Sequence, residues 1–237
     1  MKSSTNTITD PEFGLITLRE RATARHLIFR ARNDSLSVTV PPHTRREAVL
    51  KIIDEKRDVL RKLMRRKRQS LLSPGDMIPT RTFTIEISNG TYTNVCSRQL
   101  PGRVLIMVPA GIDWRTPLMQ KAIAREIHRH LKKAAENFLP QRLEQWARQT
   151  GNRYNGVIIG RGVRRLGACR SDRRITLSYH LMYLPDRLID YVILHELAHL
   201  SEMSHNARFH EICNCYCNGN ELILRKELRQ FPFPTGQ

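Results

Sequence analysis

The sequence lacks the long apolar runs of a membrane protein. Nowhere in its 237 residues does it approach the roughly 18 consecutive apolar residues that a transmembrane helix requires. Its first residues, MKSSTNTITDPEFG, also lack the apolar stretch of a secretory signal peptide. We therefore expect a protein without membrane contact, and the cytoplasm is its default location.

Cysteine is scarce, and its number is odd. Five cysteines cannot form a complete disulfide framework. Cys213, Cys215 and Cys217 alternate in a segment that reads as a helix, whereas a structural zinc site more typically contains two C-x-x-C pairs. We interpret these three residues as reduced, partly buried thiols, and a second metal site is the alternative.

Acidic residues are few relative to basic ones. The chain has 22 Asp and Glu against 40 Lys and Arg, which gives a net charge of +18. Basic residues concentrate in the ranges 45–68 and 161–174, and two such patches favour non-specific contact with a polyanion such as nucleic acid. Aromatic residues make up only 6% of the chain and do not interleave with the basic ones, so a single-strand-binding fold is not predicted.

Hydrophobic periodicity predicts short strands and one helix in the first half of the chain. The helix spans Arg45–Arg68, with an apolar stripe on one side and basic residues on the other. Asn89-Gly90 predicts a hairpin turn between two strands, and Pro101-Gly102 a second turn. The predicted strands are 15–18, 26–30, 36–40, 83–87, 92–96 and 104–108.

The second half reads as mainly helical. A helix is expected to begin at Thr116-Pro117, to be kinked or interrupted at Pro140 and to end at Gly151. His128 and His130 lie two residues apart on this charged helix, so we expect them to diverge on its surface. Strands at 157–159 and 175–179 precede a further helix that starts near Pro185-Asp186.

That further helix carries the motif H-E-x-x-H, formed by His195, Glu196 and His199. Residues four apart lie on one face of a helix, so the two histidines can bind one metal ion. Glu196, one position further round, can then act on a water molecule held at that ion. Apolar residues surround the motif on almost every side, and a buried helix carries such groups at low cost only if they are paired or ligate a metal.

A catalytic site of this type normally has a third protein ligand and one position left for water. His205 is our candidate, because Ser204 and Asn206 favour a turn that brings the chain back toward the helix. Glu202 is the alternative third ligand, near the expected helix end. Asp190 is a candidate to orient a ligand, and Tyr179, His180 or an arginine of 161–174 could stabilise an oxyanion; none of these is favoured by the pattern alone.

The segment 164–209 resembles the YgjP-like metal-dependent hydrolases, which are relatives of the SprT, WLM and Spartan zincins. Leu166 and Ala168 stand where the family usually has Trp and Ser, and His210 stands where it usually has Trp, so the differences concern the pocket lining and not the metal ligands. The matching residues are Gly167, Cys169, Leu184-Pro185, Asp190-Tyr191-Val192, His195 to Leu200, His205 and Phe209.

This resemblance implies an α+β fold, in which a zincin-like metallopeptidase core follows a β-rich N-terminal lobe. It also implies a sheet edge that accepts an extended peptide by strand addition, and we assign that edge to Ile175–Tyr179. The expected organisation is a mobile N-terminus (1–13), a β-rich lobe with one basic helix (14–115), the catalytic core (116–230) and a tail (231–237).

The leading hypothesis is a zinc metallopeptidase that acts on a peptide or protein. His195, His199 and His205 bind Zn²⁺, and Glu196 takes the proton from the attacking water. The net charge motivates a variant in which the protease acts on DNA-bound proteins. The non-enzymatic alternative is a polyanion-binding protein whose structural zinc shell is closed by a cysteine of 213–217.

Overall fold

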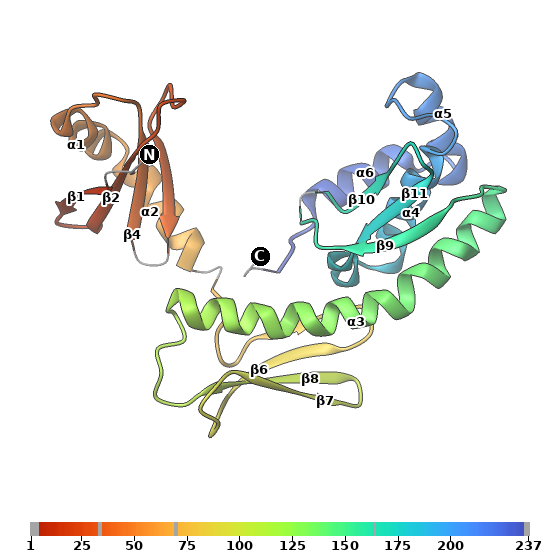
Figure 1. Cartoon of the computed structure of the whole chain (residues 1–237), viewed down its shortest axis with the longest axis horizontal. Coiled ribbons are helices and arrows are strands. Elements are labelled where there is room, and N and C mark those ends of the chain that lie inside the picture. The colour runs from red at the N-terminus through yellow and green to blue at the C-terminus, as the bar shows by residue number, and fades with distance from the viewer. Residues whose placement is uncertain (1–4, 33–34, 69–70, 164, 235–237) are drawn as a thin grey trace. The chain divides into compact units, whose positions relative to one another are not determined.

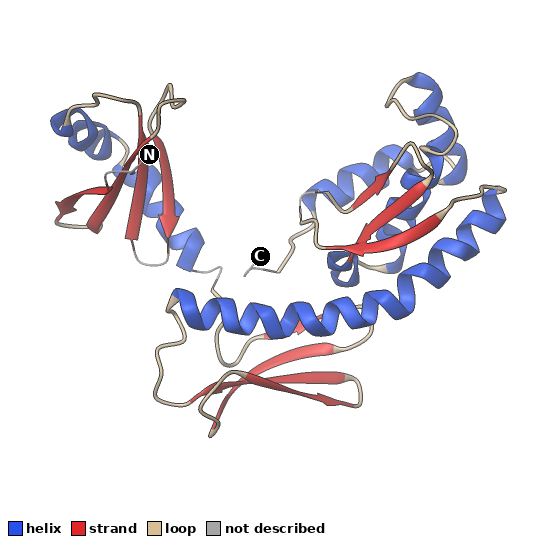
Figure 2. Cartoon of the chain, in the orientation of Figure 1, coloured by secondary structure: helices blue, strands red, loops and turns tan. Residues whose placement is uncertain are grey.

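The computed structural model describes residues 5–32, 35–68, 71–163 and 165–234 (Figure 1). Contacts divide the chain into an N-terminal unit, mainly residues 1–71, and a C-terminal unit, mainly residues 72–114 and 121–235. This division lies well before the boundary at 115 that the sequence suggested, and the second sheet belongs with the histidine motif. Both units mix helices and strands (Figure 2).

The N-terminal unit is a four-stranded sheet with two helices. Its strands are β1 (Thr5–Asp10), β2 (Gly14–Glu20), β3 (Ile28–Arg32) and β4 (Ser35–Val40), in the order β1-β2-β4-β3. We expected residues 1–13 to be mobile, but β1 pairs with β2 along its whole length, and Ile8 and Phe13 are buried in the core of the unit. Residues 1–4 lie outside the described part of the chain.

The basic segment 45–68 forms two helices instead of the single helix expected. α1 (Arg46–Glu55) ends at Lys56, whose φ of −112° and ψ of 15° leave the helical region, and α2 (Arg57–Arg68) follows at once. No Pro or Gly marks this break, so the sequence pattern did not reveal it. Val49, Ile53, Leu60 and Met64 carry the apolar stripe across the break and pack on the sheet.

The C-terminal unit begins with a second four-stranded sheet, of order β5-β6-β8-β7. Its strands are β5 (Met77–Pro79), β6 (Thr84–Gly90), β7 (Cys96–Leu100) and β8 (Arg103–Pro109). The hairpin expected at Asn89-Gly90 is wrong, because β6 pairs in parallel with β8, and β7 pairs with β8 across Pro101-Gly102. The two sheets share one sequence of pairings: antiparallel, parallel, antiparallel.

Helix α3 (Pro117–Thr150) is continuous through Pro140 and visibly curved (Figure 1). Its buried apolar residues recur every four positions, at Ile123, Ile127, Leu131, Ala135, Leu139, Leu143 and Ala147. Four residues turn an α-helix about 40° beyond one full turn, so the buried stripe winds around the helix. Different parts of the helix therefore contact different elements. Glu126 accepts a 2.9 Å hydrogen bond from Ser97 of β7, whereas Arg142 donates to Asp190 of α4.

The remaining elements surround the histidine motif. Strands β9 (Gly156–Gly160), β10 (Gly167–Cys169) and β11 (Arg174–Ser178) form a sheet of order β10-β11-β9. A 3₁₀ helix, η1 (Tyr179–Tyr183), leads into α4 (Asp186–Ala198), and α5 (Ala207–Tyr216) and α6 (Glu221–Gln230) follow. The segment 175–179 that we expected at the sheet edge is therefore the central strand, and the edges are β9 and β10.

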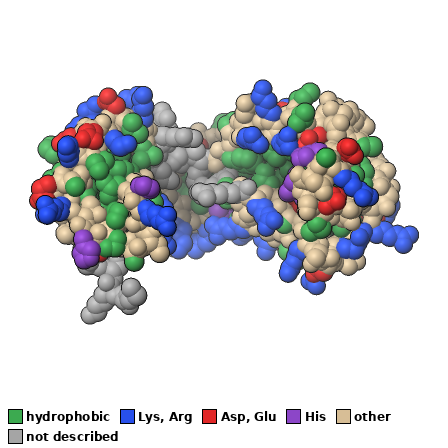
Figure 3. All heavy atoms as spheres, turned by 90° about the horizontal axis from the view of Figure 1, so that it is seen from above, with side chains coloured by type: hydrophobic (Ala, Val, Ile, Leu, Met, Phe, Trp, Pro, Cys, Tyr) green, Lys and Arg blue, Asp and Glu red, His purple; other side chains and the backbone are tan. Residues whose placement is uncertain are grey.

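Lys and Arg side chains are visible over both units, with fewer Asp and Glu (Figure 3). None of the helices in the described part of the chain combines the length and the apolar character that a membrane crossing requires.

Candidate metal centre

Helix α4 holds the first two histidines rigidly. Its apolar residues are buried around most of its circumference, so His195 and His199 start from a fixed backbone. After His199 the chain turns, with the Ser204 N–H donating to Glu202 Oε1 at 3.1 Å. The Asn206 side chain then caps α5 by accepting from the Phe209 N–H at 3.0 Å. This turn and cap bring His205 back to α4.

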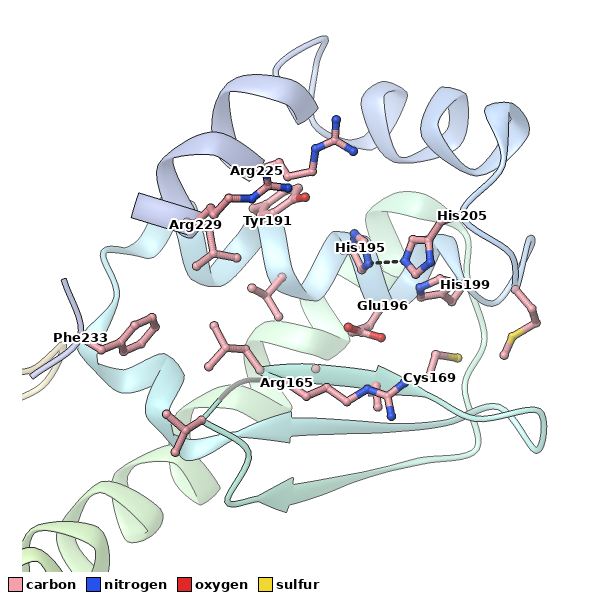
Figure 4. Close-up of a pocket in the computed structure, with 17 residues that line it drawn as sticks. Arg165, Cys169, Tyr191, His195, Glu196, His199, His205, Arg225, Arg229 and Phe233 are labelled. Carbon is pink, nitrogen blue, oxygen red and sulfur yellow. Dashed lines mark hydrogen bonds between the residues drawn. The ribbon is translucent and has the colours of Figure 1, made fainter. Parts of the chain in front are cut away.

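The three histidines converge. One ligating atom from each of His195, His199 and His205 lies within 4.8 Å of the other two (Figure 4). His195 Nε2 and His205 Nε2 are only 3.1 Å apart, and the Phe209 ring stacks on His199 at 4.4 Å between centroids. The Nδ1 of His199 lies 3.1 Å from the Glu202 carbonyl oxygen, to which it can donate, which directs Nε2 inward.

These residues fit a metal ion. Two imidazole nitrogens on one tetrahedral zinc, each about 2.05 Å from it, stand about 3.3 Å apart, close to the 3.1 Å between His195 and His205. Two nitrogens at that distance cannot both carry protons, whereas two lone pairs can share a cation. The donor set suits zinc and similar divalent metals.

The electrostatics also favour ligation. Burial lowers the pKa of His195 to about 3, with His199 and His205 acting in the same direction. Burial likewise lowers the pKa of His199. Neutral imidazole is the form that binds a metal, so both residues are ready to bind at neutral pH without losing a proton.

Glu196 points into the same pocket from the next position on α4 (Figure 4). Burial raises its pKa to about 7, while the charge of Arg165 and the backbone N–H of Cys169 act in the opposite direction. A carboxyl with this pKa can both accept and return a proton near neutral pH. Gly167 has no side chain, and the Glu196 carboxylate occupies the space that a Cβ at this position would fill.

A pocket of about 540 Å³ opens beside these residues. Strand β10 and the loop before it form one wall, and α4 forms another. Helix α6 and Phe233 extend the pocket away from the histidines. The sequence pattern did not place α6 or the tail here, although the arginines at positions 225 and 229 share one helix face, which was the available signal.

Several residues considered for the site lie elsewhere. Asp190 accepts hydrogen bonds from Arg142 at 2.6 Å and from Trp146 at 2.8 Å, and so anchors α4 to α3. Tyr179 and His180 pack with His128 in a separate buried cluster. His128 and His130 do diverge, but both are half-buried; His130 contacts Ser97 at 2.8 Å.

The cysteines are not part of the histidine group. Among the described residues, the group that can hold a metal contains no cysteine. Cys213 is hydrogen-bonded to Cys217 instead, and both are buried, whereas Cys215 is exposed. Glu202 is also outside the group, because its carboxylate accepts from the Ser204 N–H.

The wall of this open pocket carries three imidazoles beside a buried carboxylate. Such an arrangement is typical of proteins that hold a metal ion where a substrate can reach it. Comparison with known protein families then identifies the family to which the chain belongs. The model of the YgjP-like metallopeptidase domain matches residues 25–231. The chain therefore belongs to the YgjP-like metallopeptidase family, and a protein or peptide is the substrate that this membership implies. Neither a curated protein nor a solved structure matches the chain.

Proposed function

We propose that the protein is a zinc-dependent metallopeptidase with His195, His199 and His205 as metal ligands and Glu196 as general base. The observation that carries this proposal is the convergence of three imidazoles beside a buried carboxyl group on one pocket wall. Family membership supports the reaction class.

A zinc ion held by the three histidines would lower the pKa of a bound water to about 7 and polarise the carbonyl of the substrate. Glu196 accepts the proton of the attacking water and later delivers it to the leaving amine. Burial raises the pKa of Glu196 to about 7, and the positive charge of a bound zinc would act in the opposite direction, so the carboxylate is the form that would accept the proton.

Arg165 is the residue that we assign to the negative charge that develops on the substrate oxygen. It lines the pocket, and its charge lowers the pKa of both Glu196 and His199, so its field reaches the reacting groups. The other candidates, Tyr179 and His180, do not line this pocket. A cation fixed near developing negative charge stabilises the transition state more than the ground state.

Strand β10 is the edge that we expect to bind an extended peptide. The Ser178 N–H donates to Leu166 O at 2.8 Å, and the Arg170 N–H donates to Arg174 O at 2.9 Å, so alternate residues of this segment face β11. By the same alternation, the backbone groups of Gly167 and Cys169 face away from β11, toward α4. A peptide added there would lie beside Glu196, which now accepts from the Cys169 N–H and would have to release it, as we propose for a zincin-like core.

The test combines metal analysis with a peptidase assay on the full chain. We expect about one zinc per chain, cleavage of an unfolded protein substrate, and loss of cleavage on zinc removal with recovery on re-addition. Glu196→Gln should retain the metal and lose at least about 10²-fold in kcat. Full activity in Glu196→Gln would refute the assigned base. A metal without any hydrolysis would favour the structural-zinc alternative.

A further inference from the structure

The pocket extends beyond the histidines along α6 to Phe233. Figure 4 shows Phe233 at one end and His205 and Cys169 at the other, with Arg225 and Arg229 of α6 between them, near Tyr191. Arg225 and Arg229 lie four residues apart on α6, and therefore on one face, with Leu228 between them also lining the pocket. This part of the pocket, the α6 end, thus combines two guanidinium groups with apolar walls.

The charges at this end do not cancel. Arg225 Nη1 lies 3.5 Å from Oε1 of Glu221, a residue only 3% exposed, so the charge of Arg225 is largely offset by a buried carboxylate. Arg229 has no ion pair within the described part of the chain. Among the described residues that line the pocket, Glu196 is the only acidic one, and it lies beside the histidines. Within the part of the chain that the structure describes, one uncompensated positive charge therefore remains among the α6 residues that line the pocket.

The position of Arg229 in the last turn of α6 has a simpler explanation, since cations stabilise the C-terminal end of a helix dipole. That explanation requires only that the residue lies near the helix end. It does not require the side chain to line the pocket that contains Glu196, with Leu228 and Phe233 as apolar neighbours. Arg229 itself is exposed, and its neighbours Leu228 and Phe233 are half-buried, so a ligand that covers them would also shield the guanidinium from water.

We propose that the α6 end of the pocket binds a carboxylate of the substrate, and that Arg229 is the residue that selects it. This assignment rests on the proposed peptidase function. His195 and Tyr191 are four residues apart on α4 and both line the pocket, so it extends at least one helical turn, about 5.4 Å, from the histidines. An extended peptide spans about 3.3 Å per residue, which places the carboxylate at least one or two residues from the bond that is cut.

The charge balance favours a carboxylate over a phosphate. A single uncompensated guanidinium matches a group of charge −1, and a planar guanidinium can bind a carboxylate through two parallel hydrogen bonds. A phosphate carries close to two negative charges, and a second free cation at this end would be needed to balance it. The carboxylate can belong to an Asp or Glu side chain or to the C-terminus of the peptide.

Binding can be measured without turnover in the zinc-loaded Glu196→Gln variant, using fluorescein-labelled peptides. One neutral peptide is compared with versions that carry Glu or phosphoserine at each position in turn, and with free-acid and amidated C-termini. We expect one Glu position, or the free C-terminus, to improve affinity about tenfold, and Arg229→Gln in the same background to abolish the gain. Lys226→Gln is the matched control, since Lys226 is exposed on the same helix but does not line the pocket.

The outcomes separate this inference from the proposed function. A Glu-dependent gain that Arg229→Gln removes supports carboxylate selection, even if the wild type cleaves none of the peptides. Equal affinity for neutral and Glu-containing peptides with either C-terminus overturns it, even if the wild type cleaves them all. Tighter binding of phosphoserine than of Glu also overturns it. Arg229→Glu, which should instead favour a Lys-containing peptide, provides a second variant should Arg229→Gln be poorly folded.

Discussion

Gly167 and Glu196 occupy adjoining space: a Cβ added at Gly167 would lie 2.7 Å from Glu196 Cδ. The Glu196 carboxyl is buried between α4 and β10 and lines the open pocket, so an added Cβ would push it away from the strand. The strand residue therefore sets the position of the proposed base, although the two are far apart in the sequence.

Gly167→Ala should displace the Glu196 carboxylate without touching the histidines. We expect kcat to fall about 10²-fold, because a shift of about 1 Å in a catalytic group has an effect of this size. Zinc content, measured by elemental analysis, should be unchanged. Ala168→Gly, one residue along the same strand, is the control that alters β10 without intruding on Glu196. Wild-type activity in Gly167→Ala would show that the carboxylate can move freely.

His205→Ala and Glu202→Ala should differ in metal content. Removal of one of three proposed ligands should lower zinc occupancy to well below half after dialysis against a weak chelator. Glu202 uses its carboxylate to accept the Ser204 N–H and is outside the histidine group, so its variant should keep zinc. The reverse pattern would assign the third ligand to Glu202.

Asp190→Ala should reduce stability and leave the metal in place. Asp190 accepts from both Arg142 and Trp146, and the removal of such charge-assisted hydrogen bonds costs about 2 kcal/mol of unfolding free energy. Chemical denaturation measures this loss, and elemental analysis checks the zinc. Loss of zinc from a folded Asp190→Ala protein would instead indicate that Asp190 orients a metal ligand.

The N-terminal unit should lose stability in acid through Asp10. Burial acts to raise the pKa of Asp10, but hydrogen bonds from Arg57 and from the N–H groups of Phe13 and Glu12 outweigh it, so the pKa lies below 3.8. A lowered pKa stabilises the folded state above pH 3.8, and this contribution disappears as the pH falls through the folded-state value.

Asp10→Asn should therefore cost about 2 kcal/mol at pH 6 and clearly less at pH 3. Urea unfolding at the two pH values, followed by fluorescence of a probe attached in this unit, measures the difference. Asp58→Asn is the control, because the Asp58 side chain is 85% exposed. A cost independent of pH would contradict the role of the Asp10 charge.

The histidine group is the part of the molecule that local sequence describes best. Neighbouring residues determine both the spacing of His195 and His199 on one helix and the turn before Asn206. The structure brings the three histidines together as expected. Their role as zinc ligands, the catalytic role of Glu196 and the relation to SprT and Spartan stay predictions. The mixed α/β architecture was also expected.

What the sequence did not reveal depends on long-range contacts. The parallel pairing of β6 with β8 places a strand where a local turn signal at Asn89-Gly90 suggested a hairpin. The pocket wall supplied by α6 and Phe233 comes from tertiary packing, and the tail 231–237 had been expected to be loose. Residues 235–237 lie outside the described part of the chain.

The affinity of the basic ranges for nucleic acid is not tested by the structure. Position 164 and the side chains of residues 66–68 lie outside the described part, and several remaining arginines are paired. Arg57 and Arg61, for example, bind Glu12 and nearby aspartates. The ranges 45–68 and 161–174 therefore remain a prediction from charge alone.

The winding stripe of α3 determines how the C-terminal unit can come apart. Its first turns hold the β5–β8 sheet through Glu126, and its last turns hold α4 through Arg142. One uninterrupted helix packs against both the sheet and α4. Neither of them can therefore unfold without disrupting the contacts of α3. The unit should unfold in a single cooperative transition, and proteolytic cleavage inside α3 should release the metal together with the sheet.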